Sequence, residues 1–141
     1  MANNLYNILV PVDFTGKNKW DITKAIELSN SFNCNIHLVY VAGKNQSLFS
    51  RDSNTEVALK KLEQLKARFQ NQVCGEGSLE ISVLRGSKQK QLANYIKQYD
   101  MDLVVTGLSK FNVVQRIISS VSITRLAKKT NIPVLAIRSG G

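Results

Sequence analysis

The strongest constraint on the fold of this chain is a set of five short apolar runs separated by segments with helical periodicity. Each run is rich in Val, Ile or Leu and is mostly continuous, as expected for strands that are covered on both faces. The runs span residues 7–12, 35–41, 79–84, 102–107 and 133–137. The alternation of strands and helices predicts right-handed crossovers and a five-stranded parallel sheet between two helix layers.

Apolar stripes at helical spacing lie between these runs, and we expect them to pack in the core. The first helix is indicated by Trp20, Ile22, Ala25, Ile26, Ser29 and Phe32, and the second by Ala58, Leu62, Leu65 and Phe69. The third is indicated by Leu92, Tyr95, Ile96 and Tyr99, and the last by Val113, Ile117 and Val121. Ser87 precedes the third stripe and is predicted to cap that helix.

The length of 141 residues fits one domain, residues 1–141, with no room for a second. Whether residues 139–141 are a tail or lead to another domain is left open by the sequence. The first apolar run has about six residues, whereas a membrane-spanning helix needs roughly 20. With no basic leader either, we expect a cytoplasmic protein without a membrane segment.

Few residues support metal or catalytic chemistry. Cys34 and Cys74 do not form a CxxC pair, and His37 is the single histidine. We interpret the cysteines as two buried thiols and His37 as a strand residue that faces a neighbour. The sequence therefore predicts no metal site, no catalytic residue and no enzyme activity.

The net charge of +9 is concentrated in the C-terminal part. Residues 85–141 carry ten Lys or Arg against two acids, whereas residues 1–84 carry nine against eight. Such a field attracts nucleotide phosphates, nucleic acid or an acidic partner without choosing among them. Because no basic run is longer than two residues and no aromatic residues are interleaved, a solvated basic surface is favoured over a nucleic-acid site.

The first and fourth strands are expected to carry the binding site. In the commonest strand order of such sheets, 3-2-1-4-5, their carboxyl ends lie side by side where the order reverses, and ligands bind there. Asp13 follows the first strand and could accept hydrogen bonds from a ribose or an amino group, or cap the turn over residues 13–18. Gly107 ends the fourth strand, where a missing Cβ allows positive φ and close approach of a ligand.

Residues after Gly107 suggest an anion site. A helix that begins near Val114 would offer free N–H groups and the positive end of its dipole. Hydroxyl groups and positive charges in this region come from Ser119, Ser120, Ser122, Lys110 and Arg116.

At these residues the chain resembles the universal stress protein family, and the likeness covers nearly all of residues 5–138. The matching segments are residues 8–15, 37–41, 102–110 and 119–137. The resemblance implies a three-layer, doubly wound fold of the flavodoxin-like or adenine nucleotide alpha hydrolase-like type. It also implies that Asp13 lies near a ribose and adenine, and that the backbone of Val41 meets the adenine ring.

Many members of the family bind ATP through Gly-x-x-Gly, nine residues, and Gly-Ser/Thr. Here Gly107 matches the first glycine, Lys110 stands at the second, and Ser119 followed by Ser120 stands at the third. Only eight residues separate Lys110 from Ser119, so the loop is one residue short. A lysine side chain and a shorter loop would crowd the phosphates, although the Lys110 ammonium could itself contact a phosphate.

Two hypotheses follow from the resemblance. The leading one is a regulatory binding module with weakened or altered nucleotide binding, which pairs as a homodimer through Pro133–Ile137 or with a sister domain. The alternative is a slowly hydrolysing ATP-binding switch, in which Gly107, Lys110, Ser119 and Ser120 hold the phosphates. ATP or AMP is the ligand that the resemblance implies, and no cofactor is certain from the residues.

Overall fold

A computed structural model of the chain describes residues 6–14, 18–43, 51–108 and 123–138. The strands are β1 (Tyr6–Pro11), β2 (Cys34–Ala42), β3 (Leu79–Arg85), β4 (Leu103–Leu108) and β5 (Val134–Arg138). The helices are α1 (Asn18–Phe32), α2 (Arg51–Phe69), the short 3-10 helix η2 (Gln70–Gln72), α3 (Lys88–Gln98) and α5 (Ile123–Thr130). Each of the five predicted strands is therefore present at its predicted place.

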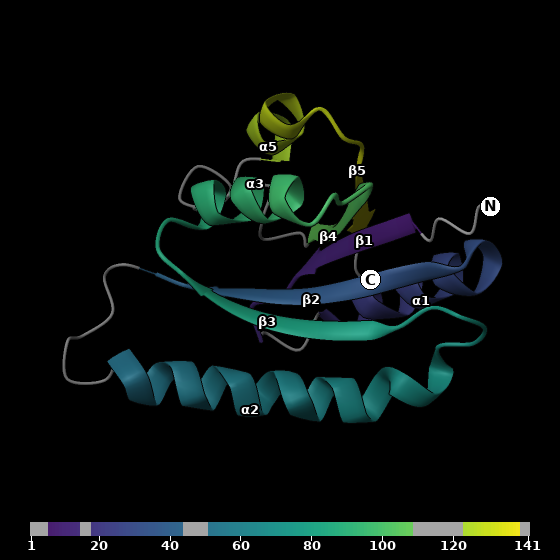
Figure 1. The fold of residues 1–141 in the computed structure, drawn as a ribbon, viewed down its shortest axis with the longest axis horizontal. Coiled ribbons are helices and arrows are strands. Elements are labelled where there is room, and N and C mark those ends of the chain that lie inside the picture. The colour runs from purple at the N-terminus through teal and green to yellow at the C-terminus, as the bar shows by residue number, and fades with distance from the viewer. Residues whose placement is uncertain (1–5, 15–17, 44–50, 109–122, 139–141) are drawn as a thin grey trace.

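The five strands form one parallel sheet in the order β3-β2-β1-β4-β5, which confirms the predicted doubly wound fold. Helices α1 and α2 cover one face of the sheet, and α3 and α5 cover the other (Figure 1). No helix in the described part of the chain is long and apolar enough to cross a membrane.

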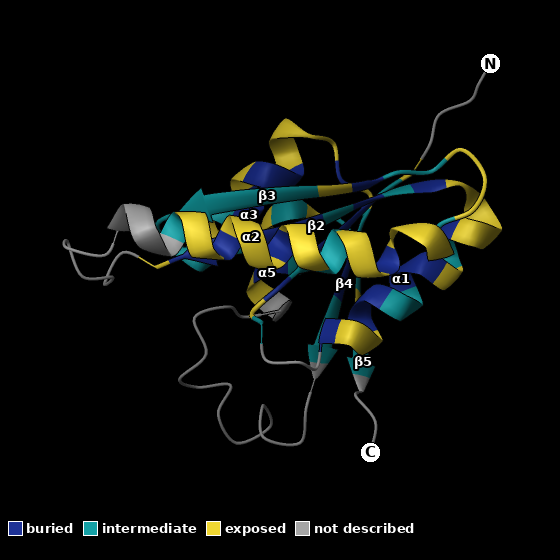
Figure 2. Ribbon diagram, turned by 90° about the horizontal axis from the view of Figure 1, so that it is seen from below, coloured by how far each residue is buried: buried dark blue, intermediate teal, exposed yellow. Residues whose placement is uncertain are grey.

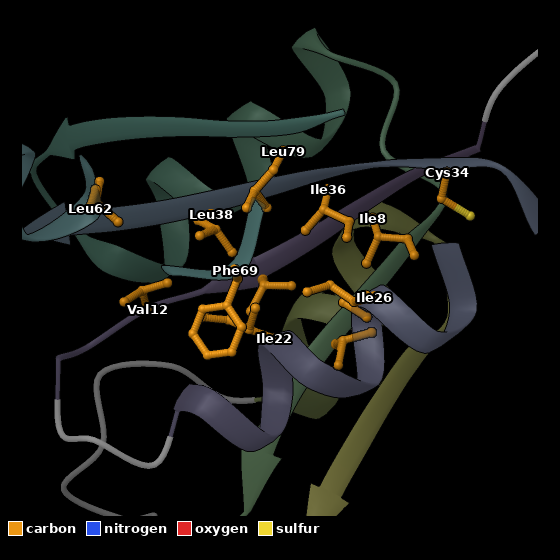
Figure 3. Packing of buried hydrophobic residues seen from close by; sticks show 13 residues of the cluster. Ile8, Val12, Ile22, Ile26, Cys34, Ile36, Leu38, Leu62, Phe69 and Leu79 are labelled. Carbon is orange, nitrogen blue, oxygen red and sulfur yellow. The ribbon is translucent and has the colours of Figure 1, made fainter. Parts of the chain in front are cut away.

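Each face of the sheet has its own core, because successive strand residues point to opposite faces. The core beneath α1 and α2 (Figure 3) contains Ile8, Val10, Val12, Ile22, Ala25, Ile26, Cys34, Ile36, Leu38, Leu62, Phe69, Leu79 and Val105. The core beneath α3 and α5 contains Leu9, Val39, Val41, Leu92, Ala93, Tyr95, Ile96, Met101, Val104 and Leu126. With both faces covered, the strands read as continuous apolar runs in the sequence.

Most residues of the predicted stripes are buried, and the outward face of α2 is exposed (Figure 2). The prediction is wrong for Trp20, Phe32 and Tyr99, whose exposed fractions are 46%, 61% and 47%. Trp20 lies in the first turn of α1, Phe32 is the last residue of that helix, and Tyr99 is the C-cap of α3. Helix ends present their side chains beyond the central strands, so the helical period alone overestimates their burial. The stripe at residues 113, 117 and 121 lies outside the described residues.

Three helices end at a residue in the left-handed conformation without using glycine. Asn33, Asp100 and Asn131 follow α1, α3 and α5 with φ of 56°, 53° and 60°. Asn and Asp tolerate this conformation better than other residues with a Cβ. At the start of α3, Ser87 occupies the predicted N-cap position, but its hydroxyl makes no capping hydrogen bond.

Candidate functional site

The candidate site lies at the carboxyl ends of β1 and β4, where the strand order reverses. The ladder between these strands consists of two pairs, Ile8↔Leu103 and Leu9↔Val104. By contrast, β1 stays paired with β2 as far as Pro11, and β4 with β5 as far as Leu108. The two halves of the sheet thus stop pairing before their strands end, at the place where doubly wound folds bind ligands.

The turn after β1 is fixed by the side chain of Asn18. Its Oδ1 accepts hydrogen bonds from the backbone N–H groups of Asp13, at 2.9 Å, and Phe14, at 3.1 Å. Phe14 has φ of 62°, which is unusual for an aromatic residue and needs such support. The Asp13 side chain is exposed at this turn. Asn18 therefore holds the backbone from which the Asp13 carboxylate is presented to solvent.

Asp21, in the first turn of α1, packs against Gly107 near the end of β4. A Cβ built on Gly107 would lie 2.7 Å from Oδ1 and 3.0 Å from Oδ2 of Asp21. The backbone of Gly107 does not have positive φ, so close approach is the reason for a glycine here. The group that approaches Gly107 closely in the described structure is the carboxylate of Asp21, and the close approach of a ligand stays a prediction.

Asp21 is 2% exposed and incompletely hydrogen-bonded. Its Oδ2 accepts a hydrogen bond from Nδ2 of Asn18 at 3.1 Å, whereas Oδ1 has no hydrogen-bond partner among the described residues. Burial raises the pKa of Asp21 to about 6, the Asn18 hydrogen bond lowers it, and the negative charge of Asp13 raises it further. The ionised form is therefore poorly stabilised at the place where two carboxylates meet.

The structure connects two of the predicted site residues. Asp13 and Gly107 are linked through a chain of contacts that runs from the Asp13 backbone to Asn18, then Asp21, then Gly107. The Val41 side chain is buried among the residues beneath α3 and α5, and the expected contact of its backbone with an adenine ring stays a prediction. Lys110, Ser119 and Ser120 lie outside the described residues.

Asn18 and Asp21 are the site residues that the sequence analysis missed. A signal for Asp21 is present, because Asp21, Ala25 and Ser29 are spaced by four residues and share the buried stripe of α1. An acid within a buried stripe is rarely fully covered unless it has a partner or a function. The signal was overlooked because the neighbouring apolar residues already explained the helix.

The described part of this site contains two carboxylates, Asp13 and Asp21. Asp13 offers an exposed acceptor for a hydroxyl or amino group. At Gly107, the carboxylate of Asp21 lies against the strand. In the described ranges, no three His, Cys, Asp or Glu residues are grouped closely enough to hold a metal ion.

His37 lies away from this site, on the α3 face of the sheet. Its Nδ1 is 2.7 Å from the hydroxyl of Tyr95, which is also 3.4 Å from Oγ of Ser82. Burial lowers the pKa of His37, and the negative charge of Glu80 raises it less. The histidine is a strand residue that faces a neighbour, as expected. Of the two cysteines, Cys34 is buried but Cys74 is exposed, so the prediction of two buried thiols is wrong for Cys74.

Comparisons with known proteins agree on one family. The Universal stress protein family matches residues 5–138. Universal stress protein UspA from Lactobacillus plantarum superposes with a TM-score of 0.70 at 22% identity, over 97% of this chain and 100% of that one. No curated protein matches the sequence.

Two further structures of similar fold have ligands in their descriptions. A universal stress protein in complex with cAMP has a TM-score of 0.69 at 15% identity, over 96% of this chain and 98% of that one. A universal stress protein from Archaeoglobus fulgidus in complex with dAMP has a TM-score of 0.68 at 18% identity, over 94% of this chain and 97% of that one. The family match over residues 5–138, together with the sheet order, shows that this chain belongs to the universal stress protein family.

Proposed function

We propose that this universal stress protein is a regulatory binding module that takes an adenine nucleoside or nucleotide at the ends of β1 and β4. The observation that carries the proposal is the exposed Asp13 carboxylate on a turn held by Asn18. A pre-positioned acceptor binds a ribose hydroxyl or an amino group with little loss of conformational freedom. Relatives of similar fold in complex with cAMP and dAMP support the ligand class.

Affinity for ATP in this proposal is weak. Lys110 and Ser119 replace two glycines of the family's phosphate loop, and the loop is one residue short. The carboxylate of Asp21 against Gly107 adds a second reason, because it places negative charge near the expected phosphates. The alternative function is the slowly hydrolysing ATP-binding switch, which a ligand screen with magnesium ATP can favour.

The test is a ligand screen by thermal denaturation, with mass spectrometry of ligands released from protein purified without added nucleotide. We expect adenosine or AMP at millimolar concentration to raise the melting temperature, and magnesium ATP to have little effect. Asp13→Asn should abolish the adenosine effect, whereas Glu27→Gln, on the exposed side of α1, should preserve it. Stabilisation by magnesium ATP of about 3 kcal/mol, as expected near a hundredfold excess over Kd, would favour the switch.

We also propose that the protein does not turn over ATP rapidly. His37 is on the opposite face of the sheet from Asp21, and its ring nitrogen contacts Tyr95. Neither Asp13 nor Asp21 has a nucleophile within its described hydrogen bonds. Phosphate release from ATP that exceeds the rate in a Gly107 variant would contradict this part of the proposal. The cytoplasmic location stays a prediction.

Dimerisation through β5 is the last part of the proposal. This strand is at one edge of the sheet, and its Leu135 side chain is 38% exposed. An apolar edge strand tends to pair with another strand. Leu135→Lys should convert a dimer to a monomer in light scattering, whereas Glu80→Lys on the opposite edge strand, β3, should not. A wild-type monomer at high micromolar concentration would exclude the homodimer.

A further inference from the structure

The carboxylate of Asp21 lies against Gly107, near the carboxyl end of β4, where the proposed function places the ligand. It is buried against the Cα of Gly107, and its nearest described polar partner is Asn18, which also holds the turn that carries Asp13. The observation rests on geometry: Oδ1 of Asp21 has no hydrogen-bond partner in the described part of the chain, and Gly107 has no side chain between that oxygen and the strand end.

No described side chain is known to neutralise this charge. Asp13, in the turn after β1, is the charged group among the described residues that acts on Asp21, and its charge has the same sign. Lys24, on the same helix, is paired with Glu27 at 3.0 Å on an exposed part of the surface. A buried charge near the protein surface acts over several ångströms at an effective dielectric constant of about 20, far below that of water. Its field therefore reaches a group bound on the other side of Gly107.

We propose that Asp21 is a specificity-determining residue that excludes anionic groups from the Gly107 end of the site while it is ionised. The inference rests on the proposed function and deepens it: the preferred ligand is an uncharged adenine nucleoside, and phosphate-bearing ligands bind when Asp21 is protonated. Asp21 does not contact the ligand in this proposal. It acts through its charge, and Gly107 transmits the field because no Cβ separates the carboxylate from the backbone.

The test compares a neutral with a singly charged ligand by isothermal titration calorimetry. The probes are adenosine and the 5′-methyl ester of AMP, because a phosphate monoester itself titrates with a second pKa of about 6. Wild type, Asp21→Asn and the control Glu27→Gln are measured at pH 5.0 and pH 7.5. Asn keeps an oxygen for Asn18 to bind and removes the charge.

At pH 7.5 we expect wild type and Glu27→Gln to bind the ester roughly tenfold more weakly than adenosine. Lowering the pH to 5.0 should remove most of this difference. Asp21→Asn should bind the ester about tenfold more tightly than wild type at pH 7.5, with no pH dependence, and should leave adenosine within twofold. Equal changes for both ligands would indicate a structural effect and overturn the inference alone. Absence of adenosine binding to wild type would overturn the proposed function, and this inference with it.

A second measurement does not depend on the variant's stability. The backbone amide of Gly107 in the wild-type protein should shift in NMR spectra as Asp21 titrates, with a midpoint near 6. An amide signal of Gly107 that stays constant between pH 4 and 8 would overturn the inference.

Discussion

Two polar clusters, one half-buried and one buried, lie on opposite faces of the same sheet, and they differ in how well their hydrogen bonds are satisfied. On the α3 face, His37, Tyr95 and Ser82 form a connected set of hydrogen bonds. On the α1 face, Asp21 has one oxygen that accepts a hydrogen bond and one that has no partner among the described residues. A satisfied cluster stabilises the core around it, whereas a carboxylate with an unpartnered oxygen costs stability and is retained when it has another role.

The two clusters also respond to pH in opposite directions. The folded state raises the pKa of Asp21, so it binds a proton more tightly than the unfolded state, and stability falls as pH rises from about 4 to about 6. The folded state lowers the pKa of His37, so stability falls as pH drops below the ordinary histidine value of 6.5. Variants of Asp21 and of His37 should therefore change the pH dependence of stability in opposite directions.

The largest effect is expected for Asp21→Asn. The shift from 3.8 to about 6 corresponds to about 3 kcal/mol at about 1.4 kcal/mol per pKa unit. The variant should match wild type near pH 4 and exceed its unfolding free energy by up to about 3 kcal/mol at pH 7.5. Urea unfolding across this range measures the difference. A difference in unfolding free energy that does not change with pH would mean that the fold does not shift the pKa of Asp21.

Gly107→Ala should have the next largest effect, a loss of about 2 kcal/mol from overpacking. The new methyl group would contact both Asp21 oxygens, and that short side chain is tied to Asn18. Gly43→Ala is the matched control, since no atom of the described residues lies within 4 Å of a Cβ at Gly43. Combining Gly107→Ala with Asp21→Ala should recover part of the loss, and strict additivity of the two changes would argue against the contact.

Tyr95→Phe should cost about 1 kcal/mol, because it removes the hydroxyl that His37 and Ser82 share. Tyr99→Phe removes a hydroxyl from an exposed tyrosine that packs on the Tyr95 ring, and it should be nearly neutral. Chemical denaturation of both variants measures the two changes in unfolding free energy. Equal losses of unfolding free energy in the two variants would mean that the hydrogen bonds of the Tyr95 hydroxyl do not stabilise the fold.

The smallest effect is expected for His37→Asn. It should appear as a change in the slope of the unfolding free energy against pH. Removing the imidazole should remove the part of the acid destabilisation that develops below pH 6.5. The stability of the variant relative to wild type should therefore rise as the pH falls from 7 to 5. The opposite trend would show that the folded protein favours the charged histidine.

Much of the fold could be predicted from the sequence, because strand and helix periodicities are local properties. The runs that became β1 to β5 and the stripe of α2 required no knowledge of the partner elements. Burial at helix ends was predicted less well, because the aromatic residues Trp20, Phe32 and Tyr99 are exposed. The period of a helix gives the direction of a side chain, but not whether another element extends far enough to cover it.

The sequence by itself determined the sheet, its strand order and the place of Asp13 and Gly107 at the reversal point. Only the tertiary structure decided what lies against Gly107, because Asp21 and Gly107 are distant in sequence and meet through the packing of α1 on β4. The physical reason is that burial and charge at a contact depend on both partners at once. The residue pattern of α1 or of β4 contains only one of the two partners, so neither pattern predicts the contact.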